Sequence, residues 1–164
     1  MSVVPRRTRP PFWHPAALVA TVAGLGYLPK APGTWASAAA VILAVGLDQA
    51  GGWIAIAIAA AVATGLGLIA VHVYLRQSAL ADPPEIVIDE LAGQWLTLAF
   101  LPFGVVGCVL GFLAFRIFDI VKPWPIRWIE QRSGAWGVVL DDLMAGLYAA
   151  ASVTVALALI DFAV

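Results

Sequence analysis

Three short acidic clusters hold most of the charge that could do chemistry in this chain. They are Asp82-Pro-Pro-Glu85-Ile-Val-Ile-Asp89-Glu90, Arg116-Ile-Phe-Asp119-Ile-Val-Lys122-Pro-Trp-Pro125 and Asp141-Asp142. Each cluster adjoins an apolar run, and a carboxylate beside hydrocarbon is costly to leave unpaired. Carboxylates gathered with Arg and Lys suggest a divalent cation with an anionic group beside it. This combination predicts phosphate chemistry on a lipid.

Two pairs of adjacent carboxylates are the candidate metal ligands. Asp89 and Glu90 fall in the first turn of an expected helix, where acids also favour the helix dipole without any further role. Asp141 and Asp142 are expected to open the last helix, and two adjacent carboxylates repel one another unless a cation lies near them. Hard oxygen donors with no Cys or His favour Mg²⁺ over zinc. We therefore predict that all four residues bind Mg²⁺.

Basic residues near these clusters are the candidate phosphate ligands. Arg116, Asp119 and Lys122 are spaced three apart, near one helical face, and two cations for one carboxylate leave positive charge over. Lys30 and Thr34 lie in a Gly- and Pro-rich loop that opens a helix, where exposed amides attract anions and Thr34 is a plausible N-cap. The predicted phosphate ligands are Lys30, Thr34, Arg116 and Lys122. The alternatives are a boundary ion pair and an ordinary turn with a snorkelling lysine.

Composition places these clusters in a membrane protein. The chain has 164 residues, 62% of them hydrophobic and only 12% charged, against about 25% charged in a soluble domain. The length predicts one domain over residues 1–164, and a net charge of −1 does not suggest nucleic acid. The pattern predicts an all-α polytopic fold with about five apolar helices. The apolar runs are 34–47, 53–75, 86–101, 105–121 and 136–160.

The placement of Lys and Arg predicts the orientation of these helices. They lie at residues 6–9, Lys30, Arg76 and 116–132, and the breaks at 48–52 and 102–104 carry none. With basic regions in the cytoplasm, residues 1–12 form a cytoplasmic basic tail. The chain then crosses the membrane five times, or three times if the short runs do not span. The acidic clusters and Lys30 are expected to converge on one cytoplasmic-side pocket. Arg127, Glu130 and Arg132 are expected in a solvated interfacial segment beside Trp124 and Trp128.

Four motifs, in order over roughly residues 20–150, resemble those of the phosphatidylglycerophosphatase A family. They are Gly24-Leu-Gly26 with Pro29-Lys-Ala-Pro-Gly-Thr34, Asp82-Pro with Ile-Val-Ile-Asp-Glu90 and Gly93, Phe115-Arg-Ile-Phe-Asp-Ile-Val-Lys-Pro-Trp-Pro125, and Gly137-Val-Val-Leu-Asp-Asp142 with Ala145-Gly146. Ala36 and Ala38 depart mildly from the family pattern. The resemblance implies an all-α, Mg²⁺-dependent enzyme at the cytoplasmic face of a bacterial inner membrane. Such an enzyme removes the terminal phosphate of phosphatidylglycerophosphate to give phosphatidylglycerol.

The predicted catalytic carboxylates are Asp89, Asp119 and Asp142, and two mechanisms stay open. In the favoured one, a carboxylate positions or deprotonates a water for in-line attack beside the metal. In the other, Asp89 or Asp142 forms a phospho-aspartate. A small transporter or scaffold subunit is the alternative class of protein. Acids clustered at one face, without an internal repeat, favour the enzyme.

Overall fold

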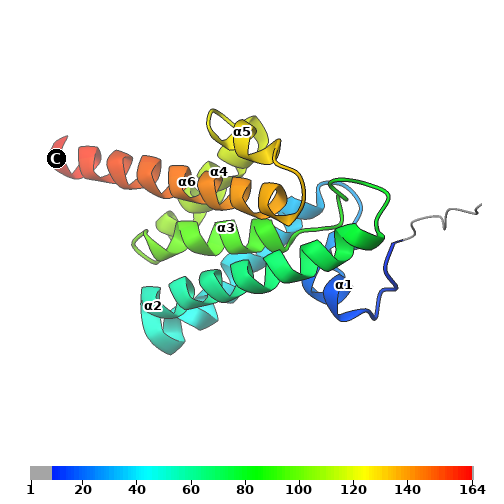
Figure 1. The fold of residues 1–164 in the computed structure, drawn as a ribbon. Helices are drawn as coiled ribbons and strands as arrows, with labels where there is room; N and C mark the ends of the chain where they lie inside the picture. The colour runs from blue at the N-terminus through cyan, green and yellow to red at the C-terminus, as the bar shows by residue number, and fades with distance from the viewer. Residues whose placement is uncertain (1–8, 164) are drawn as a thin grey trace, which may run out of the picture.

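The computed structural model describes residues 9–163, and these residues form helices without any strand. The elements are α1 (Pro15–Ala20), the 3₁₀ turn η1 (Leu25–Tyr27), α2 (Pro32–Gln77), α3 (Ile88–Ala99), α4 (Val105–Val121), α5 (Ile126–Glu130) and α6 (Ala135–Ala163) (Figure 1). The all-α prediction is confirmed. The predicted basic tail at residues 1–12 lies mostly outside the described residues.

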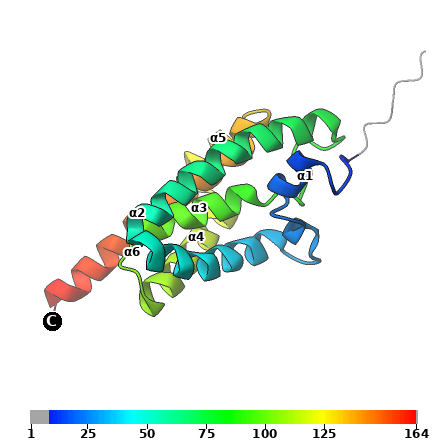
Figure 2. The ribbon, with the colours of Figure 1, turned by 90° about the horizontal axis from the view of Figure 1, so that it is seen from below.

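The long helix α2 is bent into two arms at a pair of glycines. Gly51 and Gly52 have non-helical backbone angles, and the φ of 61° at Gly52 lies in the left-handed region that favours glycine. The two arms run in opposite directions along the bundle (Figure 2). The predicted runs 34–47 and 53–75 are therefore the two arms of one element, and the break expected between them lies at this bend.

Helix α3 lies inside the bundle, packed against α2 and α6. Small residues let α3 and α6 approach closely, since a Cβ on Gly93 would lie 2.5 Å from the carbonyl oxygen of Asp142. The Thr97 hydroxyl donates to the carbonyl of Gly93 at 2.9 Å and lies within hydrogen-bonding distance, 3.2 Å, of the carbonyl of Gly146 on α6. On the other side, the Trp95 indole donates to the carbonyl of Ala40 in α2 at 2.9 Å. These contacts fix the first turn of α3 beside the start of α6.

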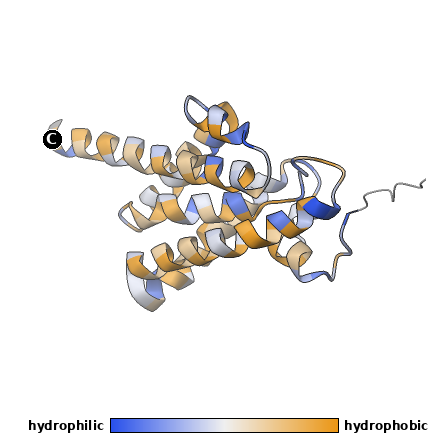
Figure 3. Ribbon diagram, in the orientation of Figure 1, coloured by the Kyte–Doolittle hydropathy of each residue, from blue (hydrophilic) through white to orange (hydrophobic). Residues whose placement is uncertain are grey.

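Two helices in the described residues, α2 and α6, are long and apolar enough to cross a membrane. Helix α3 has 12 residues and spans about 18 Å, well short of the roughly 30 Å of hydrocarbon in a bilayer. Helix α4, with 17 residues, is also short. These two candidate helices are fewer than the three to five membrane crossings that the sequence predicts. Two of the predicted apolar runs form the single helix α2, and two others form the short helices α3 and α4. Hydrophobic residues cover most of the outer helices (Figure 3), which indicates a membrane protein.

Candidate functional site

A cavity of about 840 Å³ opens where α3 and α6 begin and α4 ends. All three acidic clusters contribute to its lining, so their predicted convergence is confirmed. Within residues 9–163, seven carboxylates and three cations line the cavity: Asp82, Asp89, Glu90, Asp119, Glu130, Asp141 and Asp142, with Arg116, Lys122 and Arg132. This excess of negative charge is unfavourable for a water-filled cavity and favours a bound cation.

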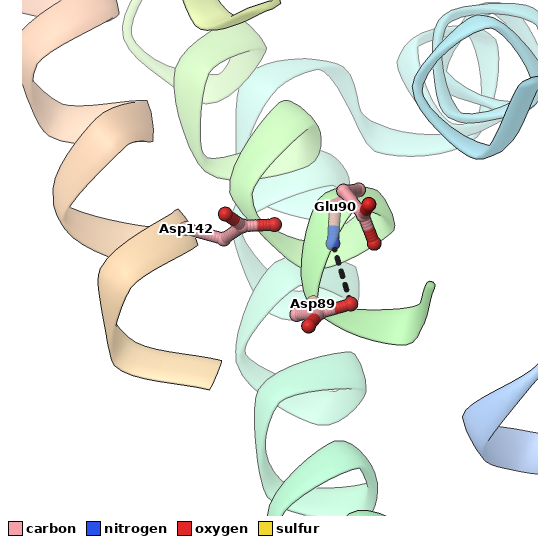
Figure 4. A group of neighbouring side chains, drawn as sticks. All are labelled: Asp89, Glu90 and Asp142. Carbon is pink, nitrogen blue, oxygen red and sulfur yellow. Dashed lines mark hydrogen bonds between the residues drawn. The ribbon is translucent and has the colours of Figure 1, made fainter. Parts of the chain in front are cut away.

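Three of these carboxylates form one group at the base of the site. Asp89, Glu90 and Asp142 each offer an oxygen within 4.8 Å of the others' oxygens. Asp142 points from α6 across to the first turn of α3 (Figure 4). One oxygen of Asp89 accepts a hydrogen bond from the backbone N–H of Glu90 at 3.1 Å. The pairing across two helices was not predictable from the spacing of either pair alone.

The electrostatics of this group fit a divalent cation. Burial raises the pKa of Asp89 well above its ordinary value, and the charges of Glu90 and Asp142 raise it further. Burial also raises the pKa of Glu90 to about 7. The Oε2 atom of Glu90 is buried and has no hydrogen-bond partner among the described residues. Three oxygen donors, one of them unpartnered, match the preference of Mg²⁺ for carboxylates.

Arg116 reaches this group from α4. Its Nη1 lies 2.6 Å from Oδ2 of Asp119 and 3.4 Å from the buried hydroxyl of Ser37. That hydroxyl donates to the carbonyl of Gly33 at 2.8 Å, which ties Arg116 to the start of α2. A Cβ on Gly33 would collide with Oε1 of Glu90 and lie 3.2 Å from Nη1 of Arg116. Glycine at position 33 therefore makes room for the carboxylate and the guanidinium together.

Lys122 caps the C-terminal end of α4 and also lines the cavity. Its ammonium donates to Oδ2 of Asp141 at 2.6 Å and to Oε1 of Glu130 at 2.8 Å. Burial alone lowers the pKa of Lys122, but these hydrogen bonds outweigh it and raise the pKa above its ordinary value. Asp141 therefore lies at the cavity, as predicted, but it is bound to Lys122 and stands outside the three-carboxylate group. Both Asp141 and Asp142 fall in the second turn of α6 rather than at its start, so a preference of acids for helix starts does not explain them.

Lys30 and Thr34 lie outside the residues that line the cavity. Lys30 is exposed, and Ala31 rather than Thr34 takes the N-cap position of α2. The prediction that Lys30 converges on this cavity with the acidic clusters is therefore wrong, as is the prediction of Thr34 as the N-cap. Their role in phosphate binding stays a prediction. Sequence reasoning missed Gly33 and Ser37 as supports of the site. Arg132 is exposed, as expected for a solvated segment, but it also lines the cavity, which was not predicted. Only the three-dimensional packing of α2 against α4 brings Ser37 to Arg116.

The arrangement can hold a divalent cation beside an anionic group. The three carboxylates can supply the cation ligands, and Arg116 and Lys122 add positive charge to the lining of the same cavity. A phosphate placed among them would have its negative charge offset from both sides. The site is therefore suited to the hydrolysis of a phosphoric monoester.

Comparisons with known proteins point to the same chemistry. The family described as Phosphatidylglycerophosphatase A matches residues 18–157. The phosphatidylglycerophosphatase A of Escherichia coli K12 is 33% identical over 160 residues, which cover 92% of this chain and 91% of that protein. The phosphatidylglycerophosphatase A of Haemophilus influenzae is 35% identical over 138 residues, covering 83% and 85%.

A third relative carries another activity in its name. A Bacteroides thetaiotaomicron protein, named as a proposed phosphatidylinositol-3-phosphatase, is 32% identical over 152 residues, covering 85% of this chain and 91% of that protein. No solved structure matches this chain. The family match and the relatives cover most of the chain, and the residues that the family matches include Asp89, Glu90 and Asp142. The chain belongs to the phosphatidylglycerophosphatase A family and is a phosphatase, a phosphoric monoester hydrolase.

Proposed function

We propose that this chain hydrolyses the terminal phosphate of phosphatidylglycerophosphate, giving phosphatidylglycerol and inorganic phosphate, with Mg²⁺ as its cofactor. This reaction would serve phospholipid biosynthesis. The observation that carries the proposal is the three-carboxylate group of Asp89, Glu90 and Asp142, which lines one cavity together with Arg116 and Lys122. The names of the two bacterial relatives support the choice of substrate.

The chain's own residues divide the work between metal and phosphate. Asp89, Glu90 and Asp142 would hold Mg²⁺, which when bound supplies Lewis-acid polarisation of a phosphoryl oxygen. Arg116 and Lys122 would bind the phosphate oxygens and offset the charge that develops on them. Asp119 and Asp141 hold these two side chains in place through ion pairs of 2.6 Å each. Asp119, predicted as catalytic, would thus act through Arg116.

Two routes to hydrolysis fit these residues. In the first, a carboxylate of the group takes a proton from a water that attacks phosphorus, the phosphorus–oxygen bond to glycerol breaks, and the glycerol oxygen leaves as a protonated hydroxyl. In the second, Asp89 or Asp142 attacks phosphorus and the same bond to glycerol breaks, with the glycerol oxygen again protonated. Water then hydrolyses the phospho-aspartate, which releases phosphate and restores the carboxylate. One in-line displacement inverts the configuration at phosphorus and two retain it. A chirally labelled thiophosphate substrate therefore distinguishes the routes.

We propose that the cavity faces the cytoplasm from the inner membrane. Residues 32–50 and 53–77 of α2 are each about as long as a span requires, and with α6 they would make three crossings. The basic residues at the cavity end of the bundle would then lie on the cytoplasmic side of the membrane. A test places single cysteines at Gln49, which is exposed beside the bend of α2, and at Ser133 in a Cys108→Ser chain. An impermeant maleimide should label Gln49→Cys in intact spheroplasts and Ser133→Cys only after lysis, and the reverse pattern would overturn the orientation.

The function is tested by phosphate release from purified protein. Phosphatidylglycerophosphate should be hydrolysed with Mg²⁺, and activity should be lost after chelation and should not be restored by zinc. Phosphatidylinositol 3-phosphate belongs in the same assay because of the name of the Bacteroides relative. A faster reaction on the inositol lipid would replace the proposed substrate, and full activity after exhaustive chelation would exclude the metal.

A further inference from the structure

Arg132 differs from the other two cations that line the cavity. Arg116 and Lys122 are ion-paired with carboxylates, whereas Arg132 has no carboxylate partner within residues 9–163. Its guanidinium lies 4.0 Å from the centre of the Trp128 ring instead. A guanidinium stacked on a ring keeps its N–H groups free for an anion. Among the described residues that line the cavity, Arg132 is thus a cation without an ion-pair partner.

The position of Arg132 is fixed by its backbone. Its N–H donates to the carbonyl of Ile129 at 2.9 Å. On the other side, a Cβ on Gly137 would collide with the carbonyl of Arg132, so the start of α6 is packed directly against it. Glu130, two residues earlier, is bound to Lys122. The segment that contains Arg132 is therefore held to the end of α4 through Lys122 and to the start of α6 through Gly137.

This segment also carries the aromatic residues that suit a lipid headgroup layer. Trp124 is 81% exposed and Trp128 is 53% exposed, and tryptophan is enriched at the interface between membrane and water. Arg132 is exposed, while Asp89 and Asp142 are buried at the base of the site. Arg132 thus lies on the side of the cavity from which a lipid headgroup would enter.

The proposed substrate has two anionic groups one glycerol apart. The terminal monoester is the group that is hydrolysed, and the phosphodiester joins the headgroup to diacylglycerol. The monoester would bind at the three-carboxylate group with Arg116 and Lys122. The phosphodiester, which is attached to diacylglycerol, would then lie nearer to the membrane. We propose that Arg132, stacked on Trp128, binds this phosphodiester as a second anion subsite; this proposal rests on the proposed function. A guanidinium can donate two parallel hydrogen bonds to phosphate oxygens.

The test compares two lipids with the same short acyl chains. Dioctanoyl phosphatidylglycerophosphate carries both anions, and dioctanoyl phosphatidic acid carries the monoester alone. Arg132→Ala should lower the ratio of their kcat/KM values about 2- to 5-fold, the size expected for one exposed charge-assisted contact. Arg132→Lys should lose less, since it keeps the charge. Arg127→Ala is the matched control, because Arg127 is exposed on α5, five residues before Arg132, but does not line the cavity.

A soluble ligand separates headgroup binding from attraction to the membrane surface. Glycerophosphoglycerol carries the diester without acyl chains, and Arg132→Ala should raise its inhibition constant by a similar factor. An unchanged ratio and an unchanged inhibition constant would overturn the subsite, as would an equal effect of Arg127→Ala. A loss on both lipids with no change for glycerophosphoglycerol would assign Arg132 to the membrane surface and also overturn it. Failure of the wild-type protein to hydrolyse phosphatidylglycerophosphate would instead overturn the proposed function.

Discussion

At the scale of single residues, replacing a carboxylate by its amide separates a metal ligand from a helix-start acid. Asp89→Asn, Glu90→Gln and Asp142→Asn keep the shape of the side chain and remove its charge. Each should lower turnover about 10²- to 10³-fold, as the loss of one charge-stabilising group does in other enzymes. The measurement is phosphate release by detergent-purified variants at matched folded concentration.

Asp161→Asn is the matched control for these three variants. Asp161 is an exposed residue at the far end of α6, away from the cavity, and its replacement should leave turnover at the wild-type value. If all three site variants also turn over at near wild-type rates, the carboxylates do not bind the metal and the group has been misinterpreted.

Asp141 should behave differently from its neighbour Asp142. Since Asp141 binds Lys122 at 2.6 Å rather than joining the three-carboxylate group, Asp141→Asn should lower turnover about 10-fold, the loss expected for one hydrogen bond to a charged group. The loss of turnover caused by Asp141→Asn should be smaller in a Lys122→Met variant, where the ion pair is already absent. Turnover rates of the two single variants and the double variant measure this coupling. Equal losses for Asp141→Asn and Asp142→Asn would indicate instead that Asp141 is a metal ligand.

At the scale of elements, the start of α2 is as important to the site as the acidic helices. A Cβ at position 33 would meet both Glu90 and Arg116, so Gly33→Ala should displace the two side chains and lower kcat/KM about 100-fold. Gly46→Ala is the control in the same helix, because a Cβ there meets nothing within 4 Å. Wild-type kinetics for Gly33→Ala would show that the start of α2 does not support the site.

Much of the element layout could be predicted from the sequence, because apolar runs end at Pro and Gly. The run 105–121 coincides with α4, and Asp89 and Glu90 do fall in the first turn of α3. The relation between elements could not be predicted in the same way. Lys30 is exposed outside the cavity because the chain turns through left-handed Lys30 and Ala31 before α2 begins at Pro32. The ion pair of Asp141 with Lys122 likewise depends on the packing of the end of α4 beside α6.

At the scale of the whole molecule, the three-carboxylate group makes stability depend on pH and metal together. The pKa of Glu90 rises from 4.5 to about 7 on folding, so between these values the folded chain binds more protons than the unfolded chain. The stability of the metal-free protein should therefore fall as pH rises through this window.

Mg²⁺ should reverse this loss, since it binds the ionised carboxylates and its stabilising effect grows as they lose their protons. Thermal unfolding in detergent at pH 5 and pH 8, with EDTA or with Mg²⁺, measures both effects. The midpoint should fall between pH 5 and pH 8 in EDTA, and the gain from Mg²⁺ should be larger at pH 8. Glu90→Gln should weaken both dependences, whereas Asp161→Asn should keep them. A metal-free midpoint that rises from pH 5 to pH 8, or a gain from Mg²⁺ that Glu90→Gln leaves unchanged, would contradict the assignment of Glu90 to the cation.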